Sequence, residues 1–237
     1  SPTNLSCNSV VPADGSILSN STGGYGTYSY LWNNGQSAAL ATGLTTGNYT
    51  LTVTDLNGCS ATASVSVSEP SAVTVTSTST DALCNGNSDG TATATALGGT
   101  GVYSYVWSTL PGQSTAIATG LSAATSIYTV TASDANNCTA TSSVTVSEPS
   151  IITATIVTTA ASCNGGDDGL ATINAVGGTP GVPNAYTYDW GLGFVTSTSS
   201  PGAPFGTAGV QSVVVSDANG CTISENYTIT EPAAISF

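Results

Sequence analysis

The sequence contains no lysine, arginine, histidine or methionine, and its 13 acidic residues give a net charge of −13. Without basic side chains the protein cannot neutralise phosphates, which excludes nucleic acid as a partner and disfavours anionic membrane surfaces. The absence of histidine removes the usual general base at neutral pH, and the absence of lysine removes Schiff-base chemistry. Pairs of acids remain as candidate catalysts, but the sequence does not place two together. We therefore expect no catalytic residues and no enzyme.

Long hydrophobic runs are also missing. None approaches the roughly 18 apolar residues that indicate a transmembrane helix, so we expect no membrane insertion. Hydrophobic residues still make up 40% of the chain, which predicts a folded protein with a buried core. The six cysteines have no histidine to complete a mixed metal site, so they indicate disulfides in an oxidising, extracellular compartment.

The chain contains three copies of one module. Trp, Asp-Gly and Glu-Pro each occur once per copy, and Gly-Gly recurs at Gly23/Gly24, Gly98/Gly99 and Gly177/Gly178. Successive Glu-Pro pairs lie 79 and 83 residues apart (Glu69 to Glu148, and Glu148 to Glu231). The first strand of module 1 is expected to be missing or supplied from elsewhere. The predicted boundaries are 1–70 for module 1, 71–149 for module 2, 150–232 for module 3, and 233–237 for the start of a following module.

Within each module the hydrophobic periodicity is two, which indicates strands. In "GTATATALGG" alanines alternate with threonines from Thr91 to Ala96. In "YSYVW" three rings share one face, and such a stripe is more typical of a core than of a carbohydrate platform. Short alternating strands between Gly, Asn, Asp and Pro residues predict an all-β fold of tandem immunoglobulin-like antiparallel β-sandwich modules.

One position in each module fits the tyrosine corner of that fold. The ring ties the start of a strand to nearby backbone, and modules 1 and 2 have Tyr49 and Tyr128 there. Module 3 has Gln211 instead, so we expect its corner to differ.

Three similar segments, "DLNGC", "DANNC" and "DANGC", end at Cys59, Cys138 and Cys221. Each lies between two predicted strands, so we interpret them as hairpin turns in which the aspartate accepts hydrogen bonds from turn amides. Asn57 and Gly58 suit a type I′ turn, because both of its central residues need a positive φ.

Each module has one early and one late cysteine, and we predict a disulfide within each module. The separations of 52, 54 and 58 residues would close three similar loops, each stabilising its module by roughly 4 kcal/mol. A redox role is disfavoured, because no basic group is present to lower a thiol pKa. The predicted pairs are Cys7–Cys59, Cys84–Cys138 and Cys163–Cys221.

No cofactor is predicted, and calcium is the alternative considered. "CNGNSDG" and "CNGGDDG" place Asn and Asp oxygens on glycine-rich loops, and calcium favours such ligands. Module 1 breaks this spacing with "CNSVVPADG", and turn chemistry explains the same residues without an ion. A glycan-binding or calcium-binding surface module is therefore the alternative function, with surface glycans as candidate partners.

Taken together, the motifs resemble a known family. Cys-Asn-Gly-x-x-Asp-Gly, Gly-Gly-Thr, Tyr-x-Tyr-x-Trp, Leu-x-x-Gly-x-Tyr, Asp-x-Asn-Gly-Cys and a closing Glu-Pro are similar to the SprB-type repeat, and module 2 matches best, from Cys84 to Pro149. This repeat occurs in very large cell-surface adhesins of gliding and related Bacteroidota. The resemblance implies secretion, surface display, and adhesion or filament building, with no catalytic residues.

The tail "EPAAISF" resembles the start of another first strand, with Ile235 and Phe237 in the places of Val73 and Val75. We expect further copies of the module as partners, either covalently in a longer chain or head-to-tail by strand donation. The family resemblance favours the covalent array. Because only Pro and a few residues join the modules, both arrangements predict a semi-rigid rod or filament.

Overall fold

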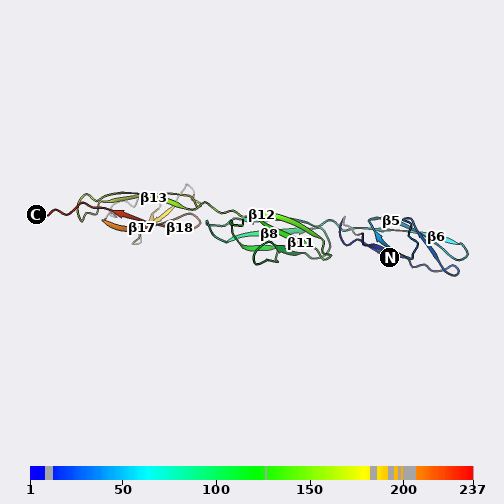
Figure 1. Cartoon of the computed structure of the whole chain (residues 1–237). Coiled ribbons are helices and arrows are strands. Elements are labelled where there is room, and N and C mark those ends of the chain that lie inside the picture. The colour runs from blue at the N-terminus through cyan, green and yellow to red at the C-terminus, as the bar shows by residue number, and fades with distance from the viewer. Residues whose placement is uncertain are drawn as a thin grey trace. The chain divides into compact units, whose positions relative to one another are not determined.

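The structure is a computed structural model. It shows an all-β protein (Figure 1). Its described residues form strands, turns and loops and no helix, so the predicted all-β class is confirmed. Within them no helix is long and apolar enough to cross a membrane. The described residues are 1–8, 13–125, 127–181, 186–191, 195–196, 199 and 207–236.

Module 1 contains two three-stranded sheets, with the orders β1-β2-β4 and β3-β5-β6. The resolved pairings within both sheets are antiparallel. The strands are β1 (Pro2–Thr3), β2 (Gly15–Leu18), β3 (Ser29–Trp32), β4 (Leu40–Leu44), β5 (Gly47–Thr54) and β6 (Ser60–Val67).

Module 2 repeats this arrangement, with sheets of order β10-β8-β7 and β12-β11-β9. The strands are β7 (Thr74–Thr80), β8 (Gly90–Leu97), β9 (Ser104–Trp107), β10 (Ile117–Leu121), β11 (Ile127–Ser133) and β12 (Thr139–Thr145).

Module 3 has a two-stranded sheet, β13-β14, and a four-stranded sheet of order β16-β15-β17-β18. In addition, the Ile173 amide of β14 donates to the Ser199 carbonyl, as the Ala94 amide of β8 donates to the Ala116 carbonyl just before β10. The strands are β13 (Thr153–Thr159), β14 (Leu170–Val176), β15 (Thr187–Asp189), β16 (Val195–Thr196), β17 (Gly209–Ser216) and β18 (Thr222–Ile229).

The division of strands between the sheets is that of the immunoglobulin sandwich. In modules 1 and 2 the first, second and fourth strands form one sheet, and the third, fifth and sixth form the other. Immunoglobulin domains divide strands A, B and E from C, F and G in the same way. The predicted immunoglobulin-like antiparallel sandwich is therefore confirmed. The first strand of module 1, expected to be missing or supplied from elsewhere, is present only as the two residues of β1, whereas β7 in module 2 has seven.

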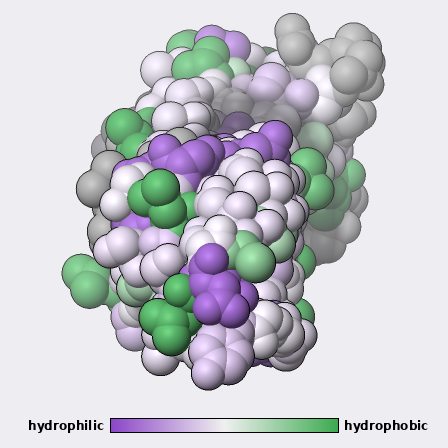
Figure 2. Space-filling model, turned by 90° about the vertical axis from the view of Figure 1, so that its right-hand side faces the viewer, coloured by the Kyte–Doolittle hydropathy of each residue, from purple (hydrophilic) through white to green (hydrophobic). Residues whose placement is uncertain are grey.

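Alternation along each strand positions the core. In β8 the predicted inward alanines, Ala92, Ala94 and Ala96, are buried, while the threonines between them are not. Trp32 in module 1 and Trp190 in module 3 lie in separate clusters of buried side chains. The face seen in Figure 2 is mostly of intermediate hydropathy, with hydrophobic side chains spread among hydrophilic ones.

The tryptophan of the aromatic stripe is buried in every module, and module 3 buries both of its tyrosines too, whereas the stripe tyrosines of modules 1 and 2 are only partly buried. Trp32 and Trp107 are each 2% exposed, and their indole N–H groups donate to backbone carbonyls. In module 3 the hydroxyl of Tyr186 likewise donates to a backbone carbonyl, that of Gly177, at 2.7 Å.

The tyrosine corner is present in module 1, where the Tyr49 hydroxyl donates to the Thr45 carbonyl at 3.0 Å. Module 3 differs, as expected, but it keeps the connection. The Gln211 amide donates to the Thr207 carbonyl at 2.8 Å, and its oxygen accepts from the Tyr227 hydroxyl at 3.0 Å. Gln211 therefore makes the same four-residue backbone tie with an amide in place of a phenol.

The chain divides into two compact units. The first contains Ser1–Thr78, Thr93–Ala118 and Tyr128–Val144. The second contains Ser79–Ala92, Thr119–Ile127 and Thr145–Phe237. Module 2 contributes to both units. Its hairpin at 134–138 belongs to the first unit, and the loop that contains Cys84 belongs to the second.

Candidate functional site in the joints between modules

Two disulfides connect consecutive modules. Cys7 pairs with Cys138 and Cys84 pairs with Cys221, each with a Cα–Cα distance of 5.6 Å. The prediction of one disulfide within each module is therefore wrong. Cys59 and Cys163, which were also predicted to be paired, are free and exposed.

The two cysteines of one module lie at opposite ends of its sandwich. In module 1 the Leu5 amide, two residues before Cys7, donates to the carbonyl of Ser68, just after β6. Cys59 directly precedes β6, which is eight residues long. At about 3.3 Å per residue, β6 separates the two cysteines by roughly 25 Å, far beyond the reach of a disulfide.

We use three names for the parts of these connections. The AB loops follow the first strand of each module and contain Cys7, Cys84 and Cys163. The FG turns are residues 55–59, 134–138 and 217–221. A joint is the AB loop of one module bound to the FG turn of the next.

The FG turns are hairpins, as predicted, but not type I′ turns. In the first of them the Gly58 amide donates to the Asp55 carbonyl, and the Asp55 amide to the Cys59 carbonyl. Only the last loop residue has a positive φ, 84° at Gly58 and 64° at Asn137. The loop has three residues, so a type I turn followed by one left-handed residue closes it.

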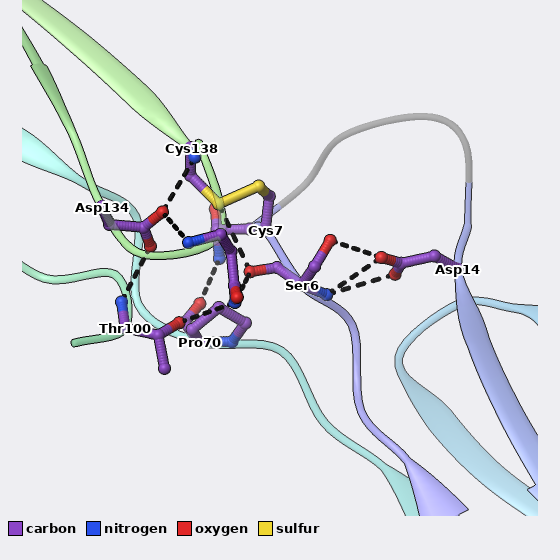
Figure 3. Close-up of a disulfide and its surroundings, with 9 residues drawn as sticks. Ser6, Cys7, Asp14, Pro70, Thr100, Asp134 and Cys138 are labelled. Carbon is purple, nitrogen blue, oxygen red and sulfur yellow. Dashed lines mark hydrogen bonds between the residues drawn. A yellow bond between two sulfur atoms is a disulfide. The ribbon is translucent and has the colours of Figure 1, made fainter.

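The first joint lies within the first unit, and its polar contacts surround the disulfide (Figure 3). The Asn136 side chain donates to the Ser6 carbonyl at 2.9 Å and to the Thr100 hydroxyl at 3.0 Å. The sulfur of Cys138 lies 3.3 Å from the same Ser6 carbonyl. The FG turn therefore binds the backbone of the AB loop as well as its cysteine.

A buried carboxylate holds the FG turn in this shape. Asp134 is 4% exposed, and it accepts hydrogen bonds from the amides of Thr100, Asn136 and Cys138 at 2.8–2.9 Å. Burial acts to raise the pKa of this carboxyl, but the three backbone amides outweigh it and keep the pKa below the ordinary value. Figure 3 shows the carboxylate between the amides of Thr100 and Cys138.

The AB loop has an aspartate of its own. Asp14 accepts hydrogen bonds from the amide and the hydroxyl of Ser6. The Ser6 hydroxyl and amide lower the pKa of Asp14. Asp168 in module 3 has the same relation to Ser162, with the same lowering of its pKa. Asp168, which lies in a loop considered as a calcium site, thus stabilises its own loop, and Asp14 does the same in module 1.

The second joint repeats the first. The Asn219 side chain donates to the Leu83 carbonyl at 3.0 Å and to the Thr179 hydroxyl at 3.2 Å. Asp217, 7% exposed, accepts from the amides of Thr179, Asn219 and Cys221 at 2.8–2.9 Å.

A further set of contacts ties the second AB loop to the Glu-Pro junction. The Asn85 side chain donates to the Glu148 carboxylate at 2.9 Å and to the Pro149 carbonyl at 3.0 Å, and the Gly86 amide donates to Glu148 at 2.7 Å. The recurring Glu-Pro motif therefore attaches the chain that leaves a module to that module's AB loop.

The Gly-Gly motif receives the chain that enters the next module. A Cβ on Gly98 would lie 2.0 Å from the Ala72 carbonyl oxygen, and one on Gly177 would lie 2.0 Å from that of Ile151. Both residues have a positive φ, 79° and 89°. Only glycine satisfies both the backbone conformation and the close approach.

Metal binding has no support among the described residues, where no group of three or more His, Cys, Asp or Glu side chains could hold an ion. Ile235, predicted to begin an inter-module strand, is 87% exposed. Phe237, its predicted companion, lies outside the described residues.

Sequence reasoning found all six cysteines, the aspartates and the glycine pairs, but it did not bring them together. It also missed the role of Asn136 and Asn219, which it treated only as turn formers. The available signal was the predicted topology itself, because the AB loop and the FG turn lie at opposite ends of an immunoglobulin sandwich.

Comparison with known proteins gives one family match. Residues 76–112 match the family model of the SprB repeat, which confirms the resemblance seen in module 2. None of the curated proteins matches the chain.

Solved structures of immunoglobulin domains are also similar to the chain. The eight N-terminal Ig domains of Down Syndrome Cell Adhesion Molecule have 14% identity and a TM-score of 0.38, over 86% of this chain and 33% of that one. Immunoglobulin domains 1–5 of Sidekick-1 have 15% identity and a TM-score of 0.29, over 86% and 52%. The amphioxus IgVJ-C2 molecule has 16% identity and a TM-score of 0.29, over 57% and 97%. The immunoglobulin-like assignment rests on the strand order described above.

Proposed function

We propose that this chain is a non-enzymatic structural and adhesive repeat protein of the bacterial cell surface, in which β-sandwich modules run in series as a semi-rigid rod or filament. Its partners are further copies of the same modules. The match of residues 76–112 to the SprB repeat supports this proposal, and so do the disulfides, which persist in an oxidising extracellular environment.

The observation that carries the proposal is that one joint is built twice. In each joint an AB-loop cysteine is bonded to an FG-turn cysteine, and an asparagine side chain binds the carbonyl beside it, at Ser6 or at Leu83. A buried aspartate shapes the turn in both. The recurring motifs of the sequence thus meet in contacts between modules, and a series of modules under tension requires such contacts.

The disulfides are expected to stiffen these connections. A short linker alone leaves a hinge, because interfaces between domains are small and relative motion is the default. A covalent bond between an AB loop and an FG turn adds a second attachment beside the linker, so that bending requires both to move. The same covalent bonds transmit tension from one module to the next.

Small-angle X-ray scattering of two variants tests this function. The control replaces the free thiols, Cys59→Ser and Cys163→Ser, and leaves both joints intact. The test variant carries these changes and also Cys7→Ser and Cys84→Ser. With about eight residues per strand at roughly 3.3 Å each plus loops, we expect the control to reach a maximum dimension on the order of 100 Å.

The test variant should show a broader distance distribution and a smaller mean dimension, because its joints have become hinges. Equal distributions for the two variants would show that the disulfides do not stiffen the chain, and the proposed rod would be abandoned.

A further inference from the structure

The two free cysteines occupy the two kinds of position that are paired in the joints. Cys163 lies in the AB loop of module 3, and Cys59 lies in the FG turn of module 1. In both observed joints the AB-loop cysteine of one module is bonded to the FG-turn cysteine of the module that follows it. The same rule would pair Cys163 with the FG turn of a following module, and Cys59 with the AB loop of a preceding one.

The AB loop around Cys163 already has the conformation seen in the second joint. The Asn164 side chain donates to the Glu231 carboxylate at 2.9 Å and to the Pro232 carbonyl at 3.2 Å, and the Gly165 amide donates to Glu231 at 2.6 Å. These contacts reproduce those of Asn85, Gly86 and Glu148. The half-joint at Cys163 therefore needs no rearrangement to receive a partner.

The FG turn around Cys59 is formed as well. Asp55 accepts hydrogen bonds from the amides of Tyr25, Asn57 and Cys59 at 2.9–3.0 Å. This is the arrangement of Asp134 and Asp217, but those two aspartates are buried within their joints whereas Asp55 is only partly buried. Asp55 is more exposed because, among the described residues, no AB loop and no entering strand cover it.

The glycine pair of module 1 points to the same partner. Gly23 and Gly24 have positive φ values of 86° and 70°, as do their counterparts in modules 2 and 3. A Cβ on Gly23 would meet nothing within 4 Å, whereas at Gly98 and Gly177 it would strike the carbonyl of an entering strand at 2.0 Å. At Gly24 the three atoms nearest to the Cβ all belong to Asp55, whereas at Gly178 an aliphatic side chain, that of Ile152, lies at 2.7 Å.

An open groove continues from this corner along module 1. It has a volume of about 520 Å³, and its lining includes Gly23, Ile17, Leu51, Val53 and Cys59. In module 3 the first strand, β13, packs Ala154 and Ile156 against the corresponding core. Ala61 and Ala63, on the inward-facing side of β6, are exposed, so the inward face of this part of module 1 is uncovered.

We propose that module 3 of one chain docks on module 1 of a second copy, and that Cys163 of the first chain forms a disulfide with Cys59 of the second. Asn57 of the second copy then binds the Ser162 carbonyl, as Asn136 binds Ser6. Ile235 of the first chain covers Gly24 of the second, and the backbone beside Ile235 approaches Gly23. The proposal deepens the proposed function, since it specifies how modules of separate chains connect.

The bond forms by thiol–disulfide exchange with a low-molecular-weight disulfide as the oxidant. The Cys59 thiolate attacks the oxidant and releases one thiol, which leaves a mixed disulfide on Cys59. The Cys163 thiolate of the other chain then attacks the Cys59 sulfur and releases the second thiol. Two cysteine thiols are oxidised, and one disulfide oxidant is reduced to two thiols.

Two single variants in a glutathione redox buffer test the pairing. Cys59→Ser keeps only the Cys163 thiol, and Cys163→Ser keeps only the Cys59 thiol. We expect each variant to remain monomeric alone on non-reducing gels and an equimolar mixture to form a covalent dimer, while the unsubstituted chain forms a ladder. Dimerisation of either variant alone to the extent of the mixture, a monomeric mixture, or a bond between Cys59 and Cys163 of one chain would overturn the proposal.

A matched pair of glycine variants tests the docking geometry. Gly23→Ala and Gly35→Ala are equivalent in the free chain, because both residues have a φ near +86° and neither Cβ would meet an atom within 4 Å. In the Cys163→Ser chain, Gly23→Ala should slow dimer formation with the Cys59→Ser chain at least tenfold, and Gly35→Ala should leave the rate unchanged.

Equal rates for the two glycine variants would also contradict the docking. The scattering experiment uses chains without either free thiol, so its result is independent of these outcomes, and the proposed function can fail or survive separately.

Discussion

At the residue scale, the protein must stabilise carboxylates without any basic side chain. It does so with backbone amides and hydroxyls, as at Asp134 in the first joint and Asp14 in its AB loop. Among the described residues, no buried side-chain nitrogen or oxygen lacks a hydrogen-bond partner. These hydrogen bonds are directional and short-ranged. Each aspartate therefore stabilises one particular loop conformation, whereas an attraction to a basic side chain would act over a longer range.

Asp134 should make the stability of the first joint depend on pH. Its pKa in the folded protein is below the ordinary value, so ionisation favours the folded state. This contribution is complete above the unfolded pKa of about 3.9 and is lost as the pH falls through the lower folded pKa. Asp134→Asn should lower the free energy of unfolding at pH 7 by about 1–3 kcal/mol, because an amide places a donor against backbone donors.

Urea denaturation at pH 7 and pH 3 measures this effect. The deficit of the variant should shrink at pH 3, because the carboxyl of the unfolded chain, with a pKa of about 3.9, is then largely protonated. Asp167→Asn is the control, because it makes the same charge change at an exposed position. A deficit of equal size at both pH values would contradict the role of the ionised carboxylate.

Gln211 offers a second test at this scale. Gln211→Ala removes the bond to the Thr207 carbonyl and leaves the hydroxyl of buried Tyr227 without its acceptor. We expect a loss of about 2 kcal/mol, compared with about 1 kcal/mol for Tyr49→Phe, which removes the single corner bond of module 1. Hydrogen exchange followed by mass spectrometry reports each module separately. Equal losses would show that the Tyr227 contact contributes nothing.

At the element scale, the strand that enters a module is held by the glycine pair it meets. Gly177→Ala and Gly23→Ala impose similar strain, because the two φ values are 89° and 86°. Only at Gly177 does the new Cβ strike a strand carbonyl. In chains without free thiols, we expect about 1–2 kcal/mol of destabilisation for Gly23→Ala and about 3 kcal/mol or more for Gly177→Ala.

Denaturation of both variants in urea provides the comparison. If they are destabilised equally, the entering strand does not depend on the glycine pair, and the close approach at Gly177 has no energetic importance.

The strands themselves could be predicted because each follows a local rule. The alternation in β8 and the aromatic stripe ending at Trp107 depend only on which face of a strand a residue occupies. The pairing of β16 with β15 follows no such rule, because a strand of two residues has no alternation that could select its neighbour.

The pairing of the cysteines could not be obtained from spacing. The regular separation of Cys7 and Cys59 suggested a loop closed within one module, although β6 lies between the two residues. Pairing depends on which end of a sandwich each loop occupies and on the position of the next module, and sequence separation contains neither. The same limitation hid Asn136 and Asn219, because their partners lie about 130 residues away.

At the scale of the whole molecule, the disulfide pairing should be visible by peptide mapping. Trypsin cannot cleave a chain without Lys or Arg, so pepsin is the suitable protease. Under non-reducing conditions we expect one linked peptide pair containing Cys7 and Cys138 and another containing Cys84 and Cys221. A peptide linking Cys7 to Cys59 would restore the pairing within modules and contradict the joints described above.

The pairing also determines how far the molecule can be stretched. With both disulfides present, the shortest covalent route from end to end runs through residues 1–7, 84–138 and 221–237, about a third of the 237 residues. Single-molecule force spectroscopy of the chain without free thiols should therefore give about a third of the extension measured after reduction, at up to roughly 3.6 Å per residue in the route.

Removal of the second disulfide separates the two pairing schemes. In a Cys84→Ser, Cys221→Ser chain the bond between Cys7 and Cys138 leaves a route through residues 1–7 and 138–237, a little under half of the chain. A bond between Cys7 and Cys59 would leave a route through 1–7 and 59–237, nearly four-fifths of it. For this measurement Cys163 is left in place and blocked by alkylation, and so is any Cys59 thiol that is free. An extension near half of the reduced value is expected, because the joint bypasses most of modules 1 and 2 together, and an extension near four-fifths would exclude it.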